Sequence, residues 1–179
     1  SYWNTSSVTS MFGTFSGASS YNRDLSNWDT SKVTSMWITF NGASSFNGDI
    51  STWNTSSVTS MLHTFDGASS FNGNLSNWDT SNVTDLREAF RDASTFNGDI
   101  SNWDISKVSD LYYTFLRTDS LTDCTKHLIY DSWSAQNHIM DFNYNDWSSL
   151  TSCSCAANNT TCGQISNNAS SDNTVIIIV

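Results

Sequence analysis

The residues of this chain that could carry out catalysis or bind a metal are three histidines, four cysteines and two series of acidic side chains. His63, His127 and His138 have no neighbours at the spacing of metal ligands, and no Ser, Cys or His stands in a motif that pairs a nucleophile with a base. A glycine-rich phosphate loop does not occur either. The sequence therefore predicts a protein that is not an enzyme.

The cysteines all lie in the last third of the chain, at Cys124, Cys153, Cys155 and Cys162. An even number of cysteines in a chain rich in Ser, Thr and Asn predicts two disulfides with three possible connectivities. Among these we favour Cys124–Cys153 with Cys155–Cys162. A zinc site is the alternative, but Cys153 and Cys155 are one residue apart, whereas zinc knuckles usually leave two residues between the ligands.

The acidic side chains, with Asn in place of Asp at some positions, recur every 25 residues along the chain. One series is Asp24, Asp49, Asn74 and Asp99, and the other is Asn4, Asp29, Asn54, Asp79 and Asp104. Stacked carboxylates repel one another unless they are hydrated, capped onto backbone amides or bridged by a cation, and Ca²⁺ accepts oxygen ligands of this kind. No loop matches the spaced acidic pattern of a calcium-binding hand, so we expect no metal and no cofactor, with calcium as the alternative.

The same period governs the apolar side chains, which return as columns of one residue type. The columns are Trp3, Trp28, Trp53, Trp78 and Trp103; Val8, Val33, Val58, Val83 and Val108; Phe15, Phe40, Phe65, Phe90 and Phe115; and Met11, Met36, Met61, Leu86 and Leu111. A fixed period of this length is typical of stacked units, none of which can bury its apolar face alone.

Within one unit, Val33, Met36, Phe40 and Ala43 are spaced by three, four and three residues, which predicts one face of a short helix or of 3₁₀ turns. Residues 46–53 alternate apolar and polar positions, which predicts a short strand. Strands stacked in register would form a parallel ladder with a spacing of about 4.8 Å. The predicted fold is therefore α/β: a right-handed solenoid of about five coils over residues 1–117.

Three polar columns accompany the apolar ones. They are Asn22, Asn47, Asn72 and Asn97; Thr5, Thr30, Thr55 and Thr80; and Thr9, Thr34, Thr59 and Thr84. Because every coil carries the Asn, we interpret that column as an internal ladder that satisfies backbone groups rather than as a ligand site. The Thr columns are read as capping and exposed hydroxyls, although a flat array of hydroxyls could also organise water, as in an ice-binding protein.

The repeated pattern is Trp-Asp/Asn-Thr-Ser-x-Val-Thr-x-Met, then Phe, Gly-Ala-Ser and Phe-Asn-x-Asp-Leu/Ile. It resembles the BspA-like leucine-rich repeat family, in the 25-residue form of mycoplasma-type surface lipoproteins and related protist and viral surface proteins. The resemblance implies a leucine-rich-repeat-like solenoid on a cell surface or in secreted form, used in adhesion or surface architecture, without catalytic residues. The fourth coil departs from the pattern at Arg87-Glu88-Ala89 and Arg91-Asp92, which would make its helix more charged.

The periodicity stops after Phe115, and residues 122–133 read as a helix whose Leu128, Ile129 and Trp133 could cover the last coil. Segment 123–133 also looks like the piece that closes arrays of the resembled family. We therefore expect three parts: the repeat solenoid over 1–117, a disulfide-bonded cap over 118–165, and a polar spacer with a terminal β-strand over 166–179.

The net charge of −10 argues against nucleic acid and against an anionic membrane surface as partners. No run of 18 apolar residues occurs, so no membrane insertion is expected. An extracellular or cell-surface location is favoured by N-glycosylation triplets. These triplets begin at Asn4, Asn54, Asn74, Asn82, Asn158, Asn159 and Asn168.

Two ends of the chain suggest self-association. The first coil would expose Trp3, Val8, Met11 and Phe15, which no preceding coil covers. The other end carries a β-branched run, Val175, Ile176, Ile177, Ile178 and Val179. We therefore predict a structural or adhesive surface protein that binds a surface protein or glycan or itself, and that assembles head to tail into a filament. The alternatives are an ice-binding protein and a glycan-binding module that uses exposed Trp.

Overall fold

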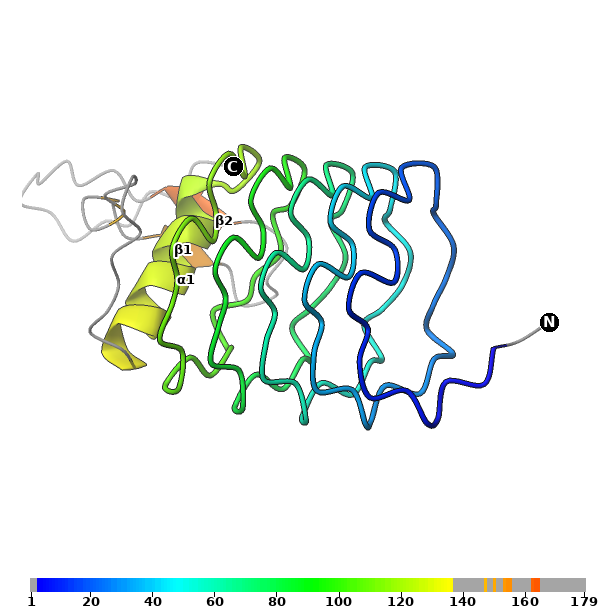
Figure 1. Cartoon of the computed structure of the whole chain (residues 1–179). Coiled ribbons are helices and arrows are strands. Elements are labelled where there is room, and N and C mark those ends of the chain that lie inside the picture. The colour runs from blue at the N-terminus through cyan, green and yellow to red at the C-terminus, as the bar shows by residue number, and fades with distance from the viewer. Residues whose placement is uncertain (1–2, 137–146, 148–149, 151–152, 156–161, 165–179) are drawn as a thin grey trace, which may run out of the picture.

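The computed structural model describes residues 3–136, 147, 150, 153–155 and 162–164. Its main body is a stack of five coils, here called the coil stack, in which equivalent positions of successive coils lie side by side (Figure 1). Helix α1 (Asp123–Gln136) lies across the end of the stack, as Figure 1 shows. Strands β1 (Cys153–Cys155) and β2 (Cys162–Gln164) pair antiparallel beside α1, with Ser154 opposite Gly163.

The expected α/β class is wrong. Residues 3–122 contain turns and isolated parallel bridges but neither a helix nor a strand, so the coils form no ladder of strands covered by helices. The bridges join Ser10, Ser35, Ser60, Asp85 and Asp110, one residue in each coil. In the part of the chain that the structure describes, α1 is the only α-helix, and the two strands lie outside the repeats.

The reason is that backbone amides in the repeats alternate between two kinds of partner. Within residues 11–18, the amides of Thr14, Ser16 and Ala18 donate to carbonyls three residues earlier and close turns. The amides of Met11 and Phe15, together with Gly13 and Gly17, donate instead to carbonyls of the next coil. A helix keeps all such bonds within itself and a strand directs them outward. The three-residue spacing of apolar side chains therefore reflects successive turns.

The predicted strand over residues 46–53 does not form: residues 51–52 make a turn, and the remaining residues have no regular secondary structure. The amide of Asn47 donates to the side-chain oxygen of Asn22 at 2.8 Å, and the amide of Asn72 donates to that of Asn47 at 2.9 Å. Asn97 continues this series. The Asn column thus forms the expected ladder, since each side-chain oxygen takes the place of a backbone partner. The ladder is not internal, however, because Asn22, Asn47 and Asn72 are exposed.

The interior of the coil stack consists of aromatic columns. The ring of Phe40 lies 5.2 Å from that of Phe15 and 5.5 Å from that of Phe65, with the rings nearly parallel. Trp53 and Trp78 stack at 6.2 Å, and each indole N–H donates to a backbone carbonyl of the preceding coil. Stacked rings with satisfied polar edges account for the strict repetition of these residue types.

Helix α1 takes the place of a sixth coil. Its Trp133 stacks on Trp103 at 6.3 Å and donates its indole N–H to the carbonyl of Ile100, as the Trp of a coil does. Gln136 bonds the carbonyl of Trp103 and the amide of Ile105. The helix predicted over 122–133 is thus confirmed, and of its covering residues Ile129 and Trp133 are buried whereas Leu128 is half-buried.

The predicted disulfide-bonded cap over 118–165 is not supported by the described residues. Cys124 on α1 is disulfide-bonded. The side chains of Cys153, Cys155 and Cys162 lie outside the described residues, so no pairing supports the predicted connectivity. Among the described residues, α1 closes the coil stack through Trp133, which stacks on Trp103.

Candidate functional site: a variable edge and its charged cluster

Three neighbouring positions of the repeat change chemical class from coil to coil, and we call them together the variable edge. They are Phe12, Trp37, Leu62, Arg87 and Tyr112; Gly13, Ile38, His63, Glu88 and Tyr113; and Ser16, Asn41, Asp66, Arg91 and Leu116. Other exposed columns keep small polar residues, such as the Thr column from Thr9 to Thr84. Stacking alone therefore does not determine the side chains of the variable edge.

The backbone of the variable edge is left-handed at its second column in every coil. Gly13 has φ 62°, and the same position has φ 49° at Ile38, 51° at His63, 53° at Glu88 and 57° at Tyr113. Glycine adopts this conformation freely, whereas other residues lose about 1–2 kcal/mol there. Four coils thus carry side chains at a position where glycine would be less strained.

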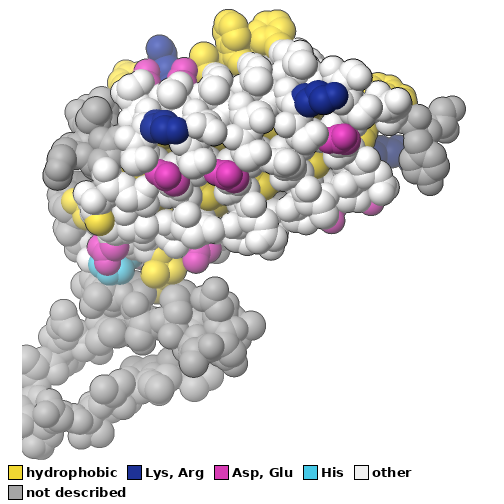
Figure 2. All heavy atoms as spheres, turned by 90° about the horizontal axis from the view of Figure 1, so that it is seen from below, with side chains coloured by type: hydrophobic (Ala, Val, Ile, Leu, Met, Phe, Trp, Pro, Cys, Tyr) yellow, Lys and Arg dark blue, Asp and Glu magenta, His cyan; other side chains and the backbone are white. Residues whose placement is uncertain are grey.

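The first coils make the apolar half of the edge. The rings of Phe12 and Trp37 meet edge to face at 4.9 Å, and their side chains are 55% and 44% exposed. Figure 2 shows hydrophobic side chains that project from one long edge of the molecule. An exposed aromatic pair on an otherwise polar surface is typical of a contact surface.

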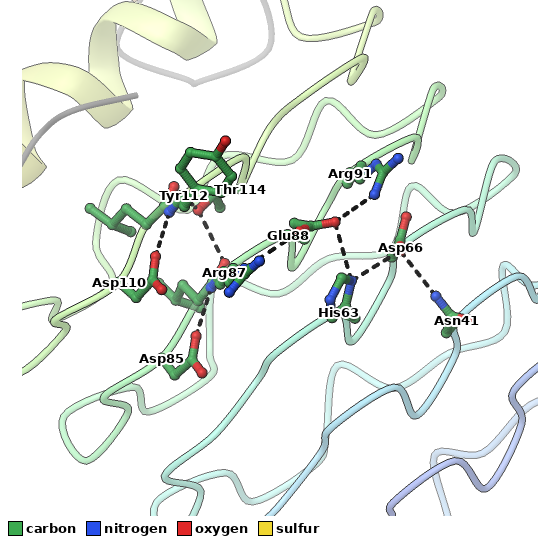
Figure 3. Close-up of polar contacts among 12 residues, drawn as sticks. Asn41, His63, Asp66, Asp85, Arg87, Glu88, Arg91, Asp110, Tyr112 and Thr114 are labelled. Carbon is green, nitrogen blue, oxygen red and sulfur yellow. Dashed lines mark hydrogen bonds and ion pairs between the residues drawn. The ribbon is translucent and has the colours of Figure 1, made fainter. Parts of the chain in front are cut away.

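The third and fourth coils carry a cluster of charged side chains (Figure 3). His63 Nδ1 lies 3.0 Å from Asp66 Oδ2 and 3.5 Å from Glu88 Oε2. Asp66 also accepts a hydrogen bond from Asn41 Nδ2 at 3.1 Å. Arg91 Nη1 donates to Glu88 Oε2 at 2.6 Å. These side chains point toward one another, and they come from three successive coils.

The burial of this cluster sets its electrostatics. Glu88 is 5% exposed, and two guanidinium groups neutralise its carboxylate: Arg91, and Arg87 with Nε 3.5 Å from Oε1. Burial raises the pKa of Asp66, while its hydrogen bond with His63 and the charge of Arg91 oppose that rise. The cluster is an ion-pair network in a partly dry site, where charges interact more strongly than on an open surface.

The fifth coil extends the charged half. Arg117 forms a bidentate ion pair with Asp92, and the Arg87 guanidinium lies 5.6 Å from the ring centre of Tyr112. Asp85 accepts the amide of Arg87, and burial raises the pKa of the Asp85 carboxyl. The charged residues by which the fourth coil departs from the repeat pattern therefore take part in this network. The more charged helix that was expected there does not form, because residues 87–92 are in turns.

The predicted acidic columns act as caps. Asp29 Oδ1 accepts the amide of Ser31 at 3.0 Å, Asp49 Oδ1 accepts the amide of Ser51 at 2.9 Å, and Asn74 does the same for Ser76. Every other member of the two series accepts the amide two residues later in the same way. These oxygens therefore have partners without a bridging cation, and Asn can replace Asp because both supply the same acceptor.

The two Thr columns differ in exposure. The column that starts at Thr5 is buried, and Thr30, Thr55 and Thr80 donate their hydroxyls to backbone carbonyls of the next coil. The column that starts at Thr9 is exposed, and its later hydroxyls donate to the preceding coil. One of the two columns is thus withdrawn from any contact with water or ice.

The residues predicted for self-association are placed differently from expectation. Trp3 is 67% exposed and Val8 is half-buried, but Met11 and Phe15 are buried within the first coils. Phe15 is covered by Tyr21, with ring centres 4.6 Å apart, as well as by the coil that follows. The expectation that Met11 and Phe15 are uncovered is therefore wrong. Residues 175–179 lie outside the described residues.

The glycosylation triplets within the coils are at the surface, since Asn4, Asn54, Asn74 and Asn82 are all exposed. Asn82 differs because its Nδ2 donates to the carbonyl of Ser56 at 2.9 Å. The remaining predicted positions, Asn158, Asn159 and Asn168, lie outside the described residues.

Two of the three histidines fall within the described part of the chain. His127 on α1 pairs with Asp131 at 3.1 Å, four residues later. His63 belongs to the charged cluster, which spacing along the sequence did not reveal because Glu88 lies a whole coil away. The signal that would have found it is the change of chemical class at one position of the repeat. Asp66 and Glu88 complete with His63 a group of metal-ligand side chains in the described residues.

The comparison with protein families adds a family assignment. A family model described as "Mycoplasma protein of unknown function, DUF285" matches residues 1–83 and 39–150. The chain belongs to this family. The DUF285 matches together cover the coil stack and α1, so the family pattern and the repeated fold coincide. No curated protein and no solved structure matches the chain. In the described part of this DUF285 chain, no helix has the length and apolar character needed to cross a membrane.

Proposed function

We propose that this chain is a non-catalytic repeat protein of an extracellular or cell surface, and that it binds a partner through the variable edge. The observation that carries the proposal is the contrast between exposed columns that repeat, such as the Thr column from Thr9 to Thr84, and the three neighbouring columns of the variable edge, whose side chains differ from coil to coil. Side chains that stacking does not require, held at a left-handed backbone position, supply the differences that a partner can recognise.

The surface location is supported by composition and by chemistry. Cys124 is disulfide-bonded, which is typical of proteins in oxidising compartments. The resemblance of the repeat to BspA-like surface proteins points the same way, and it makes adhesion or surface architecture the favoured role. Exposed Asn54 and Asn74 would then be available for glycan attachment.

The test is adhesion of beads coated with the chain to a mucin layer and to a layer of the chain itself. A Phe12→Ser/Trp37→Ser variant removes the exposed aromatic pair, and a Thr34→Ser/Thr59→Ser variant changes an exposed repeated face as a control. We expect the aromatic variant to lose at least about tenfold in binding, as for interface anchors, and the control to keep its binding. Equal binding by both variants would show that the variable edge is not the binding surface.

A glycan-binding module is the second candidate, and the exposure of Trp37 beside Phe12 favours it, since aromatic faces pack against sugar rings. A glycan array separates the two roles: a reproducible sugar that is lost in Trp37→Ala supports it. Ice binding would rest on the exposed column of Thr34, Thr59 and Thr84, and thermal hysteresis is its test. Head-to-tail assembly stays a prediction, to be tested by the particle size of the intact chain.

A further inference from the structure

Three side chains with metal-ligand atoms converge on the variable edge. His63 and Asp66 come from the third coil and Glu88 from the fourth, and the three ligand atoms all lie within 4.8 Å of one another. His63 Nδ1 lies 3.0 Å from Asp66 Oδ2 and 3.5 Å from Glu88 Oε2 (Figure 3). In a tetrahedral zinc site with bonds of about 2.0–2.2 Å, neighbouring ligand atoms lie roughly 3.4 Å apart. The 3.5 Å between His63 Nδ1 and Glu88 Oε2 is close to this ligand–ligand distance, and the 3.0 Å to Asp66 Oδ2 is somewhat shorter.

The chemistry of the three ligands selects the class of cation. One imidazole nitrogen with two carboxylate oxygens suits Zn²⁺ and similar divalent transition metals, whereas Ca²⁺ requires six to eight oxygen ligands. The two carboxylates carry two negative charges, which balance one divalent cation when His63 is neutral. The combination also occurs once in the coil stack: the equivalent pairs in the first two coils are Gly13 with Ser16 and Ile38 with Asn41.

Arg91 is the group that competes with a cation. Its Nη1 donates to Glu88 Oε2, the same oxygen that faces His63. The Arg91 Nε, however, is buried without a hydrogen-bond partner, although Asp92 Oδ2 lies 3.3 Å away. A buried donor without a hydrogen bond disfavours this position of the guanidinium. Because the side chain is 35% exposed, rotation toward solvent would free Glu88 and hydrate this nitrogen.

We infer that His63, Asp66 and Glu88 form a binding site for a zinc-class divalent cation, and that the Arg91 guanidinium occupies the place of this cation in the metal-free chain. A neutral His63 ligates through Nδ1 in the tautomer that carries its proton on Nε2, and binding moves Arg91 away from Glu88. Asn41, which donates to Asp66, then orients that ligand as an outer partner. The site joins the third and fourth coils at the variable edge, and it is independent of the partner proposed for that edge.

The experiment uses the full chain with its disulfide bonding intact, freed of metal by a chelator and titrated with Zn²⁺, Co²⁺ and Ca²⁺. We expect one Zn²⁺ per chain by calorimetry, a Co²⁺ absorption spectrum of tetrahedral nitrogen and oxygen ligation, and no competition by Ca²⁺. His63→Ala should weaken Zn²⁺ binding by more than about 100-fold, beyond the range for loss of an outer partner. Arg91→Gln should strengthen it about tenfold, since the competing cation is gone.

The matched control is His127→Ala, which removes a histidine that pairs with a carboxylate on α1, outside the cluster. It should leave Zn²⁺ binding unchanged, and circular dichroism of the metal-free variants should match that of the parent chain. Zn²⁺ binding that survives His63→Ala would place the metal elsewhere and overturn the inference. Absence of binding in the parent chain, even if Arg91→Gln binds, would also overturn it, because Arg91 would then close the site.

Discussion

In the interior of the coil stack each column keeps one residue type or a similar apolar one, whereas along the variable edge the side chains differ in chemical class from coil to coil. Phe40, Phe65 and Phe90 occupy equivalent places in three successive coils, and their rings stack on one another. Trp37 and Leu62 are likewise equivalent, but the next coil places Arg87 there. The contrast separates what the fold requires from what it tolerates, because each interior ring must fit two identical neighbours.

The largest expected effect comes from a break in the interior. Phe65 is buried between Phe40 and Phe90, so Phe65→Ala should cost about 3–5 kcal/mol of unfolding free energy. Trp37→Ala removes an aromatic ring from the variable edge and should cost less than about 1 kcal/mol. Urea unfolding at equilibrium measures both, and similar losses for the two variants would erase the distinction between the regions.

A second prediction concerns the left-handed positions that flank the edge. Gly67 has φ 71°, and an added Cβ would lie 3.4 Å from the Cα of Gly42. Gly67→Ala should therefore cost about 1–2 kcal/mol. Ser70→Ala, at an exposed site of the same coil, is the control and should change the unfolding free energy by less than about 0.5 kcal/mol. A neutral Gly67→Ala would show that these positions tolerate side chains without strain.

The Asn ladder allows a sharper test of the repeated face. Asn47→Ala removes the oxygen that accepts the amide of Asn72, and should cost about 1 kcal/mol. Asn47→Asp keeps an oxygen at the same place and should retain most of the stability. Hydrogen exchange at the Asn72 amide gives the local readout: faster exchange is expected in Asn47→Ala alone, and unchanged exchange in that variant would contradict the ladder.

The smallest effects on the unfolding free energy are expected from pH, and they differ in sign between the capping aspartates and Asp85. Hydrogen bonds from the serine two residues later lower the pKa of Asp24, Asp29, Asp79 and Asp104 on the repeated face. Their stabilisation is present above the unfolded pKa of about 3.9 and is lost as pH falls through the lower folded value. Burial raises the pKa of Asp85, so its contribution is instead lost as pH rises through the folded value.

Replacement of the four repeated-face aspartates by Asn keeps the capping oxygen, as Asn54 and Asn74 do, and removes the charge. The unfolding free energy of this variant, measured between about pH 2 and pH 6, should depend less on pH than that of the parent chain. Asp85→Asn should remove a destabilisation that grows with pH. An unaltered acid dependence in the fourfold variant would mean that other carboxyls control it.

The columns and their period could be predicted from the sequence because the same residue types recur at equivalent positions. The closing helix could be predicted because this recurrence ends after Phe115. The nature of the coils could not, because turns that repeat every three residues space apolar side chains much as a helix does. The burial of Phe15 was not predicted because the repeat pattern does not show that Tyr21, six residues later in the same coil, packs against it. The charged cluster escaped prediction because His63 and Glu88 are neighbours only after the coils stack.

The sequence separation between the two partners of each cross-coil backbone bond affects how the number of repeats can change in evolution. Cross-coil amides find their partners about one repeat away along the chain, as in the bonds of Met11 with Ser35 and of Thr34 with Thr9. Unequal recombination that inserts or deletes whole units leaves these pairings in step, whereas an indel of part of a unit disturbs the bonds of the coil that carries it. Gene segments could thus be duplicated or lost without harm to the fold, and each such event would rearrange the order of side chains along the edge.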